Sequence, residues 1–326
     1  MEFGLDPAQV ELQQTVERFF ADRFPLDGVG DREGVPVDRG TWGDLAAMGL
    51  FGLVTAEDAG GSGLGVLEAA LTFEQVGSYL VPGPLLWTVL AAPLVDGAVS
   101  GDRIVGGIEA GSIDDGSAAV EHAPDLDVLL VVEDDRVIAH RTTDLAPPEP
   151  LASLDPLTPV GRFVGLGGGE VVSGADAAAE LRRRGTVLAA AVLVGVASRA
   201  LETARAYALE RHQFDVPIGS FQAIKHLLAD MYVATSLAQS STYGAAAVLD
   251  DPRADDPGRS AGSAKLLAAD AAINGAGTAV QVLGGMGFTW AMLPHYLLKR
   301  AWVLEQSFGS ADDHALRLGS ILVPSP

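Results

Sequence analysis

The residue types best suited to chemistry gather in residues 211–231, RHQFDVPIGSFQAIKHLLADM. An apolar-periodic helix is expected to end near Arg211. A tight turn at Pro217 and Gly219 should follow, and Ser220 is expected to cap a second long helix. A guanidinium in such a corner suits a phosphate or pyrophosphate, because its planar fork donates paired, charge-assisted hydrogen bonds. The spacing predicts one corner between two helices for the side chains of Arg211, Gln213, Phe214 and Gln222.

A second candidate segment is QVLGGMG, residues 281–287, at the end of a later helix. We expect Gln281 and Gly285 to lie one turn apart on the same face, and the glycines allow a backbone or a ligand to approach closely. Taken alone, the same letters also describe a plain glycine C-cap. Considered together with the Arg211 stretch, the segment is instead interpreted as a place where a ligand contacts the backbone.

The elements that must position these residues form three expected domains. Residues 1–100 form a helical domain, residues 101–175 a reduced β domain, and residues 176–326 an antiparallel four-helix bundle, so that the fold class is α+β and mostly α. Asp6-Pro7 and Asp256-Pro257 each predict an N-cap followed by proline at the first helical position. Helices are expected over residues 5–24, 40–51, 66–80, 85–95, 185–211, 220–249, 258–284, 294–307 and 312–319, and strands over 103–107, 128–132, 137–140, 160–164 and 170–172 with a hairpin turn at 133–136.

Composition excludes several classes of partner. The chain has 326 residues, no cysteine and a formal net charge of −22, which repels nucleic acid and anionic membrane surfaces. The most apolar run, residues 187–197, is too short to span a bilayer and is expected to be a core helix. Residues 1–20 do not resemble a secretory signal, so we expect a cytoplasmic location. The six histidines show no metal-ligand spacing, and no metal is expected.

The Arg211–Gln222 stretch resembles the R-x-x-F-G-x-P-I-x-x-F-Q run of the acyl-CoA dehydrogenase family, and residues 281–287 are similar to its Q-x-x-G-G-x-G segment. Residues 5–86 also resemble the family's N-terminal domain, although no proline precedes Glu57. The resemblance implies α,β-desaturation of an acyl-CoA, with FAD as cofactor and FAD contacts that cross a subunit interface. The implied FAD-contact residues are Arg211, Gln213, Phe214, Gln222, Gln281, Val282, Leu283, Gly284 and Gly285.

The chain also departs from the family pattern. It has neither the T-E-P-x-x-G-S-D loop nor the W-x-T strand of the middle domain. Thr142 could serve as a substitute, but its place after a strand favours its interpretation as a turn residue. By register on Gly309, Phe308 occupies the position of the usual catalytic glutamate. A minority of the family draws its base from the helix after the F-Q motif, and that position falls on Asp251. Asp215 replaces the glycine after Phe214 and would repel a pyrophosphate or orient Arg211.

Three interpretations follow, and all of them expect an oligomer. In the first, the chain is a short subunit of a heteromeric acyl-CoA dehydrogenase, of the kind that oxidises steroid-type CoA thioesters in actinobacteria, and it contributes FAD-binding residues to a full-length partner subunit. In the second, it is a self-sufficient homo-oligomeric enzyme with Asp251 as the catalytic base. In the third, it is a structural or binding protein that has lost the flavin.

Overall fold

The computed structural model describes residues 4–253 and 255–322, and these form two compact units. The bundle unit comprises the residues up to Asp31, Ala70–Val81 and the chain from Thr186 onward, and the sheet unit comprises Arg32–Ala69 and Pro82–Gly185. The three-way division at residues 1–100, 101–175 and 176–326 stays a prediction. The fold itself is α+β and mostly helical, as expected.

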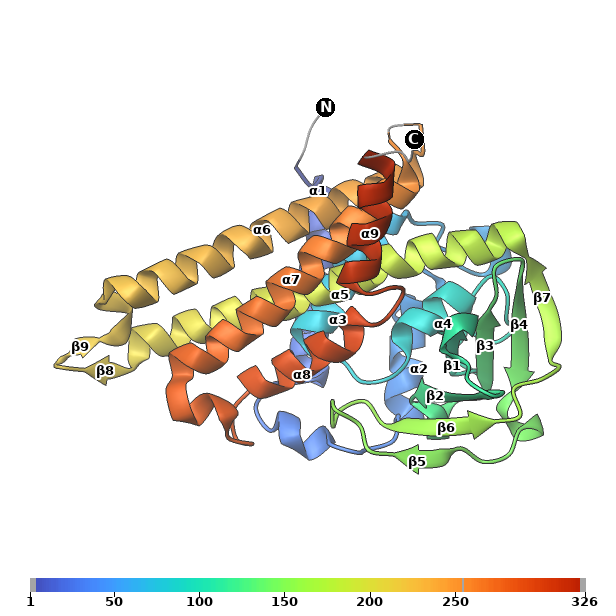
Figure 1. Ribbon diagram of the computed structural model, residues 1–326, viewed down its shortest axis with the longest axis horizontal. Helices are drawn as coiled ribbons and strands as arrows, with labels where there is room; N and C mark the ends of the chain where they lie inside the picture. The colour runs from blue at the N-terminus through green and yellow to red at the C-terminus, as the bar shows by residue number, and fades with distance from the viewer. Residues whose placement is uncertain (1–3, 254, 323–326) are drawn as a thin grey trace. The chain divides into compact units, whose positions relative to one another are not determined.

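Long antiparallel helices make up the bundle unit (Figure 1). Helix α7 packs against α6, α8 and α9. The interior is rich in alanine, which lets the helix backbones lie close together. The helices of this unit are α1 (Pro7–Arg23), the greater part of α3 (Val66–Ser78) and of α5 (Ala175–Glu210), α6 (Gln222–Asp250), α7 (Pro257–Leu283), α8 (Pro294–Glu305) and α9 (Ala311–Leu322).

Local sequence signals set several helix starts. The carboxylate of Asp6 accepts a hydrogen bond from the N–H of Gln9 at 2.9 Å, and the Gln9 side chain returns one to the N–H of Asp6, which completes a capping box. Asp256 likewise accepts from the N–H of Arg259 at 2.6 Å. Both predicted pairs of an N-cap and a proline are therefore confirmed.

Two glycines set the close approach of α3 and α5. A Cβ at Gly77 would stand 1.9 Å from the carbonyl oxygen of Val192, and one at Gly195 would stand 1.8 Å from that of Glu74. Neither contact is possible for a larger residue. Residues 187–197 of α5 are all buried, so the expected core helix is confirmed. Helix α5 and the segment Pro257–Phe288 are each long and apolar enough to cross a membrane, but most of each apolar window lies inside the fold.

A buried carboxylate links three helices of the bundle unit. Glu74 of α3 is 5% exposed and accepts hydrogen bonds from the Tyr243 hydroxyl and, at 2.9 Å, from the Gln239 side chain, both on α6. Gln13 of α1 donates to the Tyr243 oxygen at 3.4 Å. Burial raises the pKa of Glu74, while the bonds from Tyr243 and Gln239 lower it by less.

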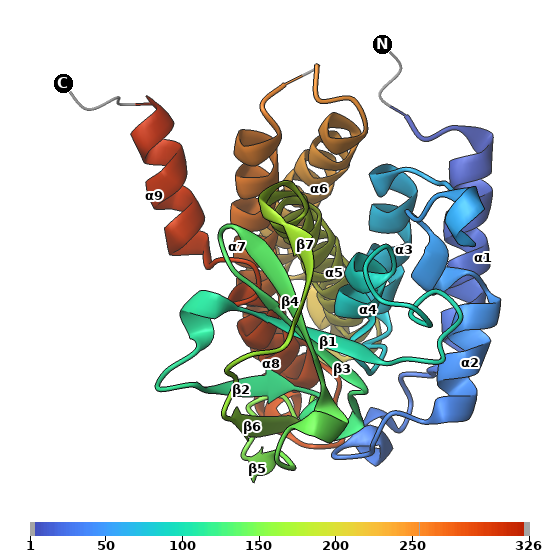
Figure 2. The ribbon, with the colours of Figure 1, turned by 90° about the vertical axis from the view of Figure 1, so that its right-hand side faces the viewer.

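Two sheets lie in the sheet unit (Figure 2). The first has the order β1-β3-β4-β7, with β1 parallel to β3 and the other neighbours antiparallel, and the second is antiparallel in the order β2-β6-β5. Trp87 of α4 lies against Gly107 of β1, where a Cβ would come within 2.2 Å of the indole ring. The elements of this unit include α2 (Arg39–Ala47), α4 (Leu85–Ala91), β1 (Val105–Glu109), β2 (Ser117–Glu121), β3 (Val128–Val132), β4 (Arg136–Arg141), β5 (Glu149–Leu151), β6 (Val160–Val164) and β7 (Glu170–Gly174).

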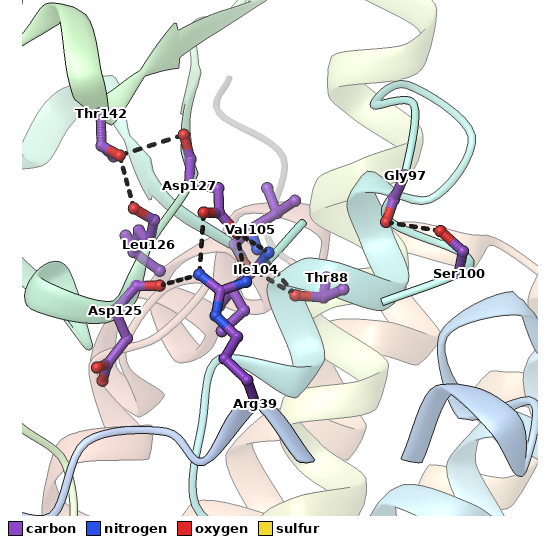
Figure 3. A network of polar contacts seen from close by, with 10 residues as sticks. All are labelled: Arg39, Thr88, Gly97, Ser100, Ile104, Val105, Asp125, Leu126, Asp127 and Thr142. Carbon is purple, nitrogen blue, oxygen red and sulfur yellow. Dashed lines mark hydrogen bonds and ion pairs between the residues drawn. The ribbon is translucent and has the colours of Figure 1, made fainter. Parts of the chain in front are cut away.

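Asp127 connects α2 to the first sheet (Figure 3). Its carboxylate accepts two hydrogen bonds from Arg39, at 2.8 and 2.9 Å, and one from the N–H of Ile104 at 2.7 Å. Burial by itself raises the pKa of Asp127, but the bonds from Arg39 and Ile104 outweigh it, and the net direction is downward. Thr88 completes the network by exchanging hydrogen bonds with the backbone of Val105.

Some sequence expectations were wrong. Ser220 does not cap α6: the N-cap is Phe221, and the Ser220 hydroxyl donates to the carbonyl of Pro217 at 2.7 Å instead. Helix α5 begins at Ala175 rather than near residue 185, because buried Leu181 and the ion pairs of Glu180 with Arg183 and Arg184 support its first turns. Strands β2 and β5 were not expected, since their sequences lack the β-branched runs of the other strands.

Candidate functional site

The Arg211 stretch forms a two-stranded hairpin between α5 and α6. Strands β8 (His212–Gln213) and β9 (Val216–Pro217) pair antiparallel, and the N–H of Ile218 donates to the carbonyl of Arg211 at 2.8 Å. The tight turn therefore lies at Phe214 and Asp215, not at Pro217 and Gly219. Both turn residues have positive φ, 53° and 64°, a conformation that usually selects Asn or Gly.

The hairpin presents its polar side chains to solvent. The side chains of Arg211 and Gln222 are exposed and make no hydrogen bond or ion pair with any residue that the structure describes. The Gln213 amide donates to the carbonyl of His212 at 2.7 Å, and Phe214 is 87% exposed with its ring edge against Phe221. A guanidinium without a partner among the described residues, in the same hairpin as an exposed aromatic ring, can bind an anionic, partly aromatic ligand.

Asp215, in the turn of the same hairpin, is exposed as well. Among the described residues it forms no ion pair with Arg211, so the sequence hypothesis that it orients Arg211 has no support in the geometry of this chain. An exposed carboxylate here weakens the attraction of the hairpin for an anion, by about 1 kcal/mol at 4 Å in water.

The segment Gln281–Gly285 closes α7 and opens the 3₁₀ turn Gly284–Phe288. Gln281 is exposed and has no side-chain partner among the described residues. Val282 and Leu283 are buried, so only their backbone is available to a ligand. Gly284 has φ 65° and ψ −144°, a glycine conformation, and a Cβ at Gly284 or Gly285 would meet nothing within 4 Å. Because α7 ends at Leu283, Gly285 does not continue the helical face of Gln281 as the sequence suggested.

The two segments lie at the same end of the bundle. Helix α5 ends and α6 begins at the hairpin, and α7, which runs antiparallel to α6, ends near it before α8 starts (Figure 1). Exposed aromatic residues continue this end beyond Gly285: Phe288 is 73% exposed and Trp290 63%. Figure 1 shows the hairpin and the end of α7, the two segments that carry the predicted residues, at one end of the bundle, and the residues of the predicted set other than Val282 and Leu283 are exposed there.

Asp251 lies at the opposite end of α6, which is 29 residues long and so spans roughly 43 Å. Its carboxylate forms a two-point ion pair with Arg253, with N–O distances of 2.7 and 3.0 Å. This hydrogen bond lowers the pKa of Asp251. A carboxylate so held is a weak proton acceptor, and its role as a base stays a prediction.

The segment where the family carries its usual glutamate is built as a rigid turn. Phe308 is buried and has φ 58°, and Gly309 follows with φ 90°. The fully buried Lys265 of α7 donates to the carbonyls of Glu305 and Gly309, each at 2.8 Å. Glu305 itself accepts from the N–H of Ala311 at 2.7 Å, at the start of α9. This turn therefore holds no free carboxylate at position 308.

Thr142 does not replace the missing middle-domain motifs. Its hydroxyl donates to the carbonyls of Leu126 and Asp127, at 2.6 and 3.2 Å, and so fixes the end of β4 (Figure 3). The interpretation of Thr142 as a turn residue holds. Among residues 4–253 and 255–322, no group of three or more acidic or histidine side chains is placed to hold a metal ion.

Comparison with known proteins gives the family. Residues 6–96 match the acyl-CoA dehydrogenase N-terminal domain, and residues 173–319 match the acyl-CoA dehydrogenase C-terminal domain. The chain belongs to the acyl-CoA dehydrogenase family. It is accordingly an oxidoreductase that acts on acyl-CoA.

Relatives within the family include short and long proteins. The acyl-CoA dehydrogenase IpdE2 of Mycolicibacterium smegmatis is 33% identical over 283 residues, which cover 83% of this chain and 84% of that protein. The acyl-CoA dehydrogenase FadE34 of Mycobacterium tuberculosis is 33% identical over 279 residues, but this chain spans only 39% of its length. Among solved structures, a chain of the ChsE4–ChsE5 complex from Mycobacterium tuberculosis has a TM-score of 0.86, 26% identity and full coverage of both chains.

Proposed function

We propose that this acyl-CoA dehydrogenase chain is one subunit of a heteromeric enzyme, and that it contributes residues which contact FAD at the interface with a full-length partner subunit. The observation that carries the proposal is a contrast within one chain. Arg211, Gln222 and Gln281 are exposed at one end of the bundle and have no side-chain partner among the residues that the structure describes, while Phe308 stands where the family places its catalytic glutamate. A similar chain of known structure belongs to a complex of two different proteins.

The residues at this end fit the adenosine diphosphate part of FAD. The exposed guanidinium of Arg211 can donate two parallel hydrogen bonds to a pyrophosphate, and the amides of Gln222 and Gln281 offer further donors and acceptors. The open space above Gly284 and Gly285 allows a ligand to reach the backbone. Exposed Phe214 supplies an apolar face beside them.

Bound FAD would accept the β-hydride of an acyl-CoA while a carboxylate removes the α-proton, which leaves a carbon–carbon double bond. In this proposal the partner supplies that carboxylate, since position 308 of this chain holds a phenylalanine. The acyl group that we propose to test first is a steroid-type CoA thioester, on the sequence resemblance described above.

The test is the visible absorbance spectrum of the purified chain, alone and after co-expression with a full-length acyl-CoA dehydrogenase encoded beside it. We expect flavin bands near 450 nm, roughly the usual position for this cofactor, only in the co-purified complex. Flavin in the isolated chain would instead favour the self-sufficient enzyme, and its absence from both samples would favour the flavin-free homologue.

Substitution of Arg211 tests whether this chain's residues bind the flavin. Removal of a charge-assisted hydrogen-bond donor should weaken FAD binding by about 10- to 100-fold. We expect Arg211→Ala to lower the flavin content of the complex, and Arg211→Lys to restore it only in part, because an ammonium group lacks the planar fork. Arg18→Ala, an exposed site on α1, is the control. Equal flavin content in Arg211→Ala and Arg18→Ala would refute the assignment.

A further inference from the structure

A cavity of about 450 Å³ lies on one face of the first sheet, and all of its lining residues belong to the sheet unit. Its volume falls in the range of roughly 300–1,000 Å³ that is usual for small-molecule sites. The lining comes from the segment that follows α4 and from β3, β4 and β7. Its aliphatic members are buried or half-buried, and they are Leu94, Val95, Val128, Ala139 and Val172.

The register of the first sheet brings charged side chains to the same face as this aliphatic lining. Ala139 and Arg141 are two residues apart on β4 and therefore share a face of the sheet. Glu170 of β7 pairs with Ala139, which places the Glu170 side chain diagonally from that of Arg141. Arg103, just before β1, and Asp96, after α4, add one further charge of each sign to the cavity.

These four charged side chains do not pair with one another. Arg103 and Arg141 are exposed and make no side-chain hydrogen bond or ion pair with any residue that the structure describes. Asp96 and Glu170 are also exposed and have no such partner in the described part of the chain. Two cations and two anions thus share one cavity without contact between them.

The remaining carboxylate of the cavity, Asp127, is already occupied. It accepts two hydrogen bonds from Arg39, at 2.8 and 2.9 Å (Figure 3), and Arg103 acts on it only through its charge. The chain carries 43 acidic and 21 basic residues, so carboxylates that could neutralise an arginine are plentiful. Other arginines of the sheet unit do pair with carboxylates, namely Arg39, Arg136, Arg182, Arg183 and Arg184.

The mixture of charges favours a ligand that carries both signs. A simple anion would be attracted by the two arginines but repelled by Asp96 and Glu170, and a simple cation would meet the reverse. A zwitterion avoids both penalties, because its carboxylate accepts charge-assisted hydrogen bonds from guanidinium groups while its ammonium group donates to carboxylates. The aliphatic lining of the cavity can bury an apolar side chain of the same ligand.

We infer that this cavity binds a small zwitterion with an aliphatic side chain, of the chemical class of the aliphatic amino acids. Arg103 and Arg141 bind its carboxylate, and Asp96 and Glu170 bind its ammonium group. The inference concerns residues of the sheet unit alone and does not depend on the proposed heteromeric function.

The test is isothermal titration calorimetry of the full chain with three probes. Leucine carries the carboxylate, the ammonium group and the aliphatic side chain, and it should bind. Isocaproate lacks the ammonium group and isoamylamine lacks the carboxylate. Each should bind at least about tenfold more weakly than leucine, because one charged pair is lost and the facing charges of the cavity then repel the ligand.

Substitutions place the binding in this cavity. Arg141→Gln and Glu170→Gln should each weaken leucine binding by about tenfold. The matched controls are Arg162→Gln on β6 and Glu149→Gln on β5, which change an exposed arginine and an exposed glutamate outside the cavity lining and should leave leucine binding unchanged. Leucine should also raise the melting temperature of the wild type and of both controls, since it binds only the folded state.

Three results would overturn the inference. Absence of leucine binding to the wild type would show that the cavity does not take this class of ligand. Binding of isocaproate as tight as that of leucine would show a simple anion site instead. Equal affinity for leucine in Arg141→Gln and Arg162→Gln would place the binding elsewhere on the chain.

Discussion

Asp251 carries its charge at an exposed end of α6, held by two hydrogen bonds from Arg253. A general base typically contributes about 10²- to 10⁴-fold to a rate. Because the Arg253 pair lowers the pKa of Asp251, we expect Asp251→Asn to leave turnover of the flavin-containing complex within about twofold. Steady-state kinetics with an acyl-CoA substrate measures this directly. A loss of 10²-fold or more would return Asp251 to the position of catalytic base.

His314 makes the turn at Phe308 sensitive to acid. Its Nε2 lies 3.0 Å from the Phe308 carbonyl, to which it donates, and a Cβ at Gly262 would stand 3.2 Å from Nδ1. Burial lowers the pKa of His314, and the charges of Lys265 and Arg317 add to this. A lowered folded-state pKa means that stability is complete above the unfolded value, 6.5, and is lost as the pH falls below it.

We therefore expect the unfolding free energy of the wild type to fall between pH 7 and pH 5 more steeply than that of His314→Gln, which keeps an N–H donor but does not titrate. The difference in slope should not exceed about 1.4 kcal/mol per pH unit. Denaturant titrations at a series of pH values provide the measurement. Parallel curves for the two proteins would show that His314 does not charge on unfolding.

Glu74 joins helix α3 to helix α6 through hydrogen bonds from Tyr243 and Gln239. The pKa of Glu74 is raised in the folded state, so its effect on the unfolding free energy depends on pH in the opposite direction to that of His314. The stabilising contribution is complete below the unfolded-state pKa, 4.5, and is lost as the pH rises through the folded-state pKa. Tyr243→Phe removes one donor from the buried carboxylate. The variant should lose about 1–3 kcal/mol of stability once Glu74 ionises, and less at pH 4.

The double variant Glu74→Gln/Tyr243→Phe is the control for the Glu74–Tyr243 hydrogen bond, because the neutral amide of glutamine does not titrate. Compared with Glu74→Gln, it should show a loss that does not change between pH 4 and pH 8. A pH-independent loss in the Tyr243→Phe single variant would mean that Glu74 stays in one protonation state throughout.

Helix ends were predicted correctly from the sequence where the stabilising hydrogen bonds join residues that are close together in the chain. The capping residues Asp6 and Asp256 were foreseen because their hydrogen bonds lie within one turn. Ser220 was misjudged, since a 3₁₀ turn intervenes and its hydroxyl bonds backward. Strand β5, with a proline in its three residues, depends on pairing with β6, a long-range contact that no local pattern carries.

The candidate site was foreseen to a similar extent. The hairpin and the glycine segment were placed in the chain by their motifs, and the antiparallel order of α5, α6 and α7 then brings them to one end of the bundle. Sequence spacing did not reveal that Lys265 is buried against the 305–309 turn, because that contact joins residues forty positions apart. The FAD contacts themselves stay a prediction.

The net charge of −22 acts on every association of the chain. The screening length falls from about 10 Å at 0.1 M salt to about 3 Å at 1 M. Repulsion between copies should therefore weaken as salt is added, and attraction to a basic partner should weaken as well. We expect self-association to rise and the affinity for the full-length dehydrogenase to fall between 0.05 and 0.5 M NaCl, as roughly set by that screening. Sedimentation velocity at the two salt concentrations tests both. If the heteromeric affinity rises with salt as self-association does, apolar contact rather than charge attraction drives the complex.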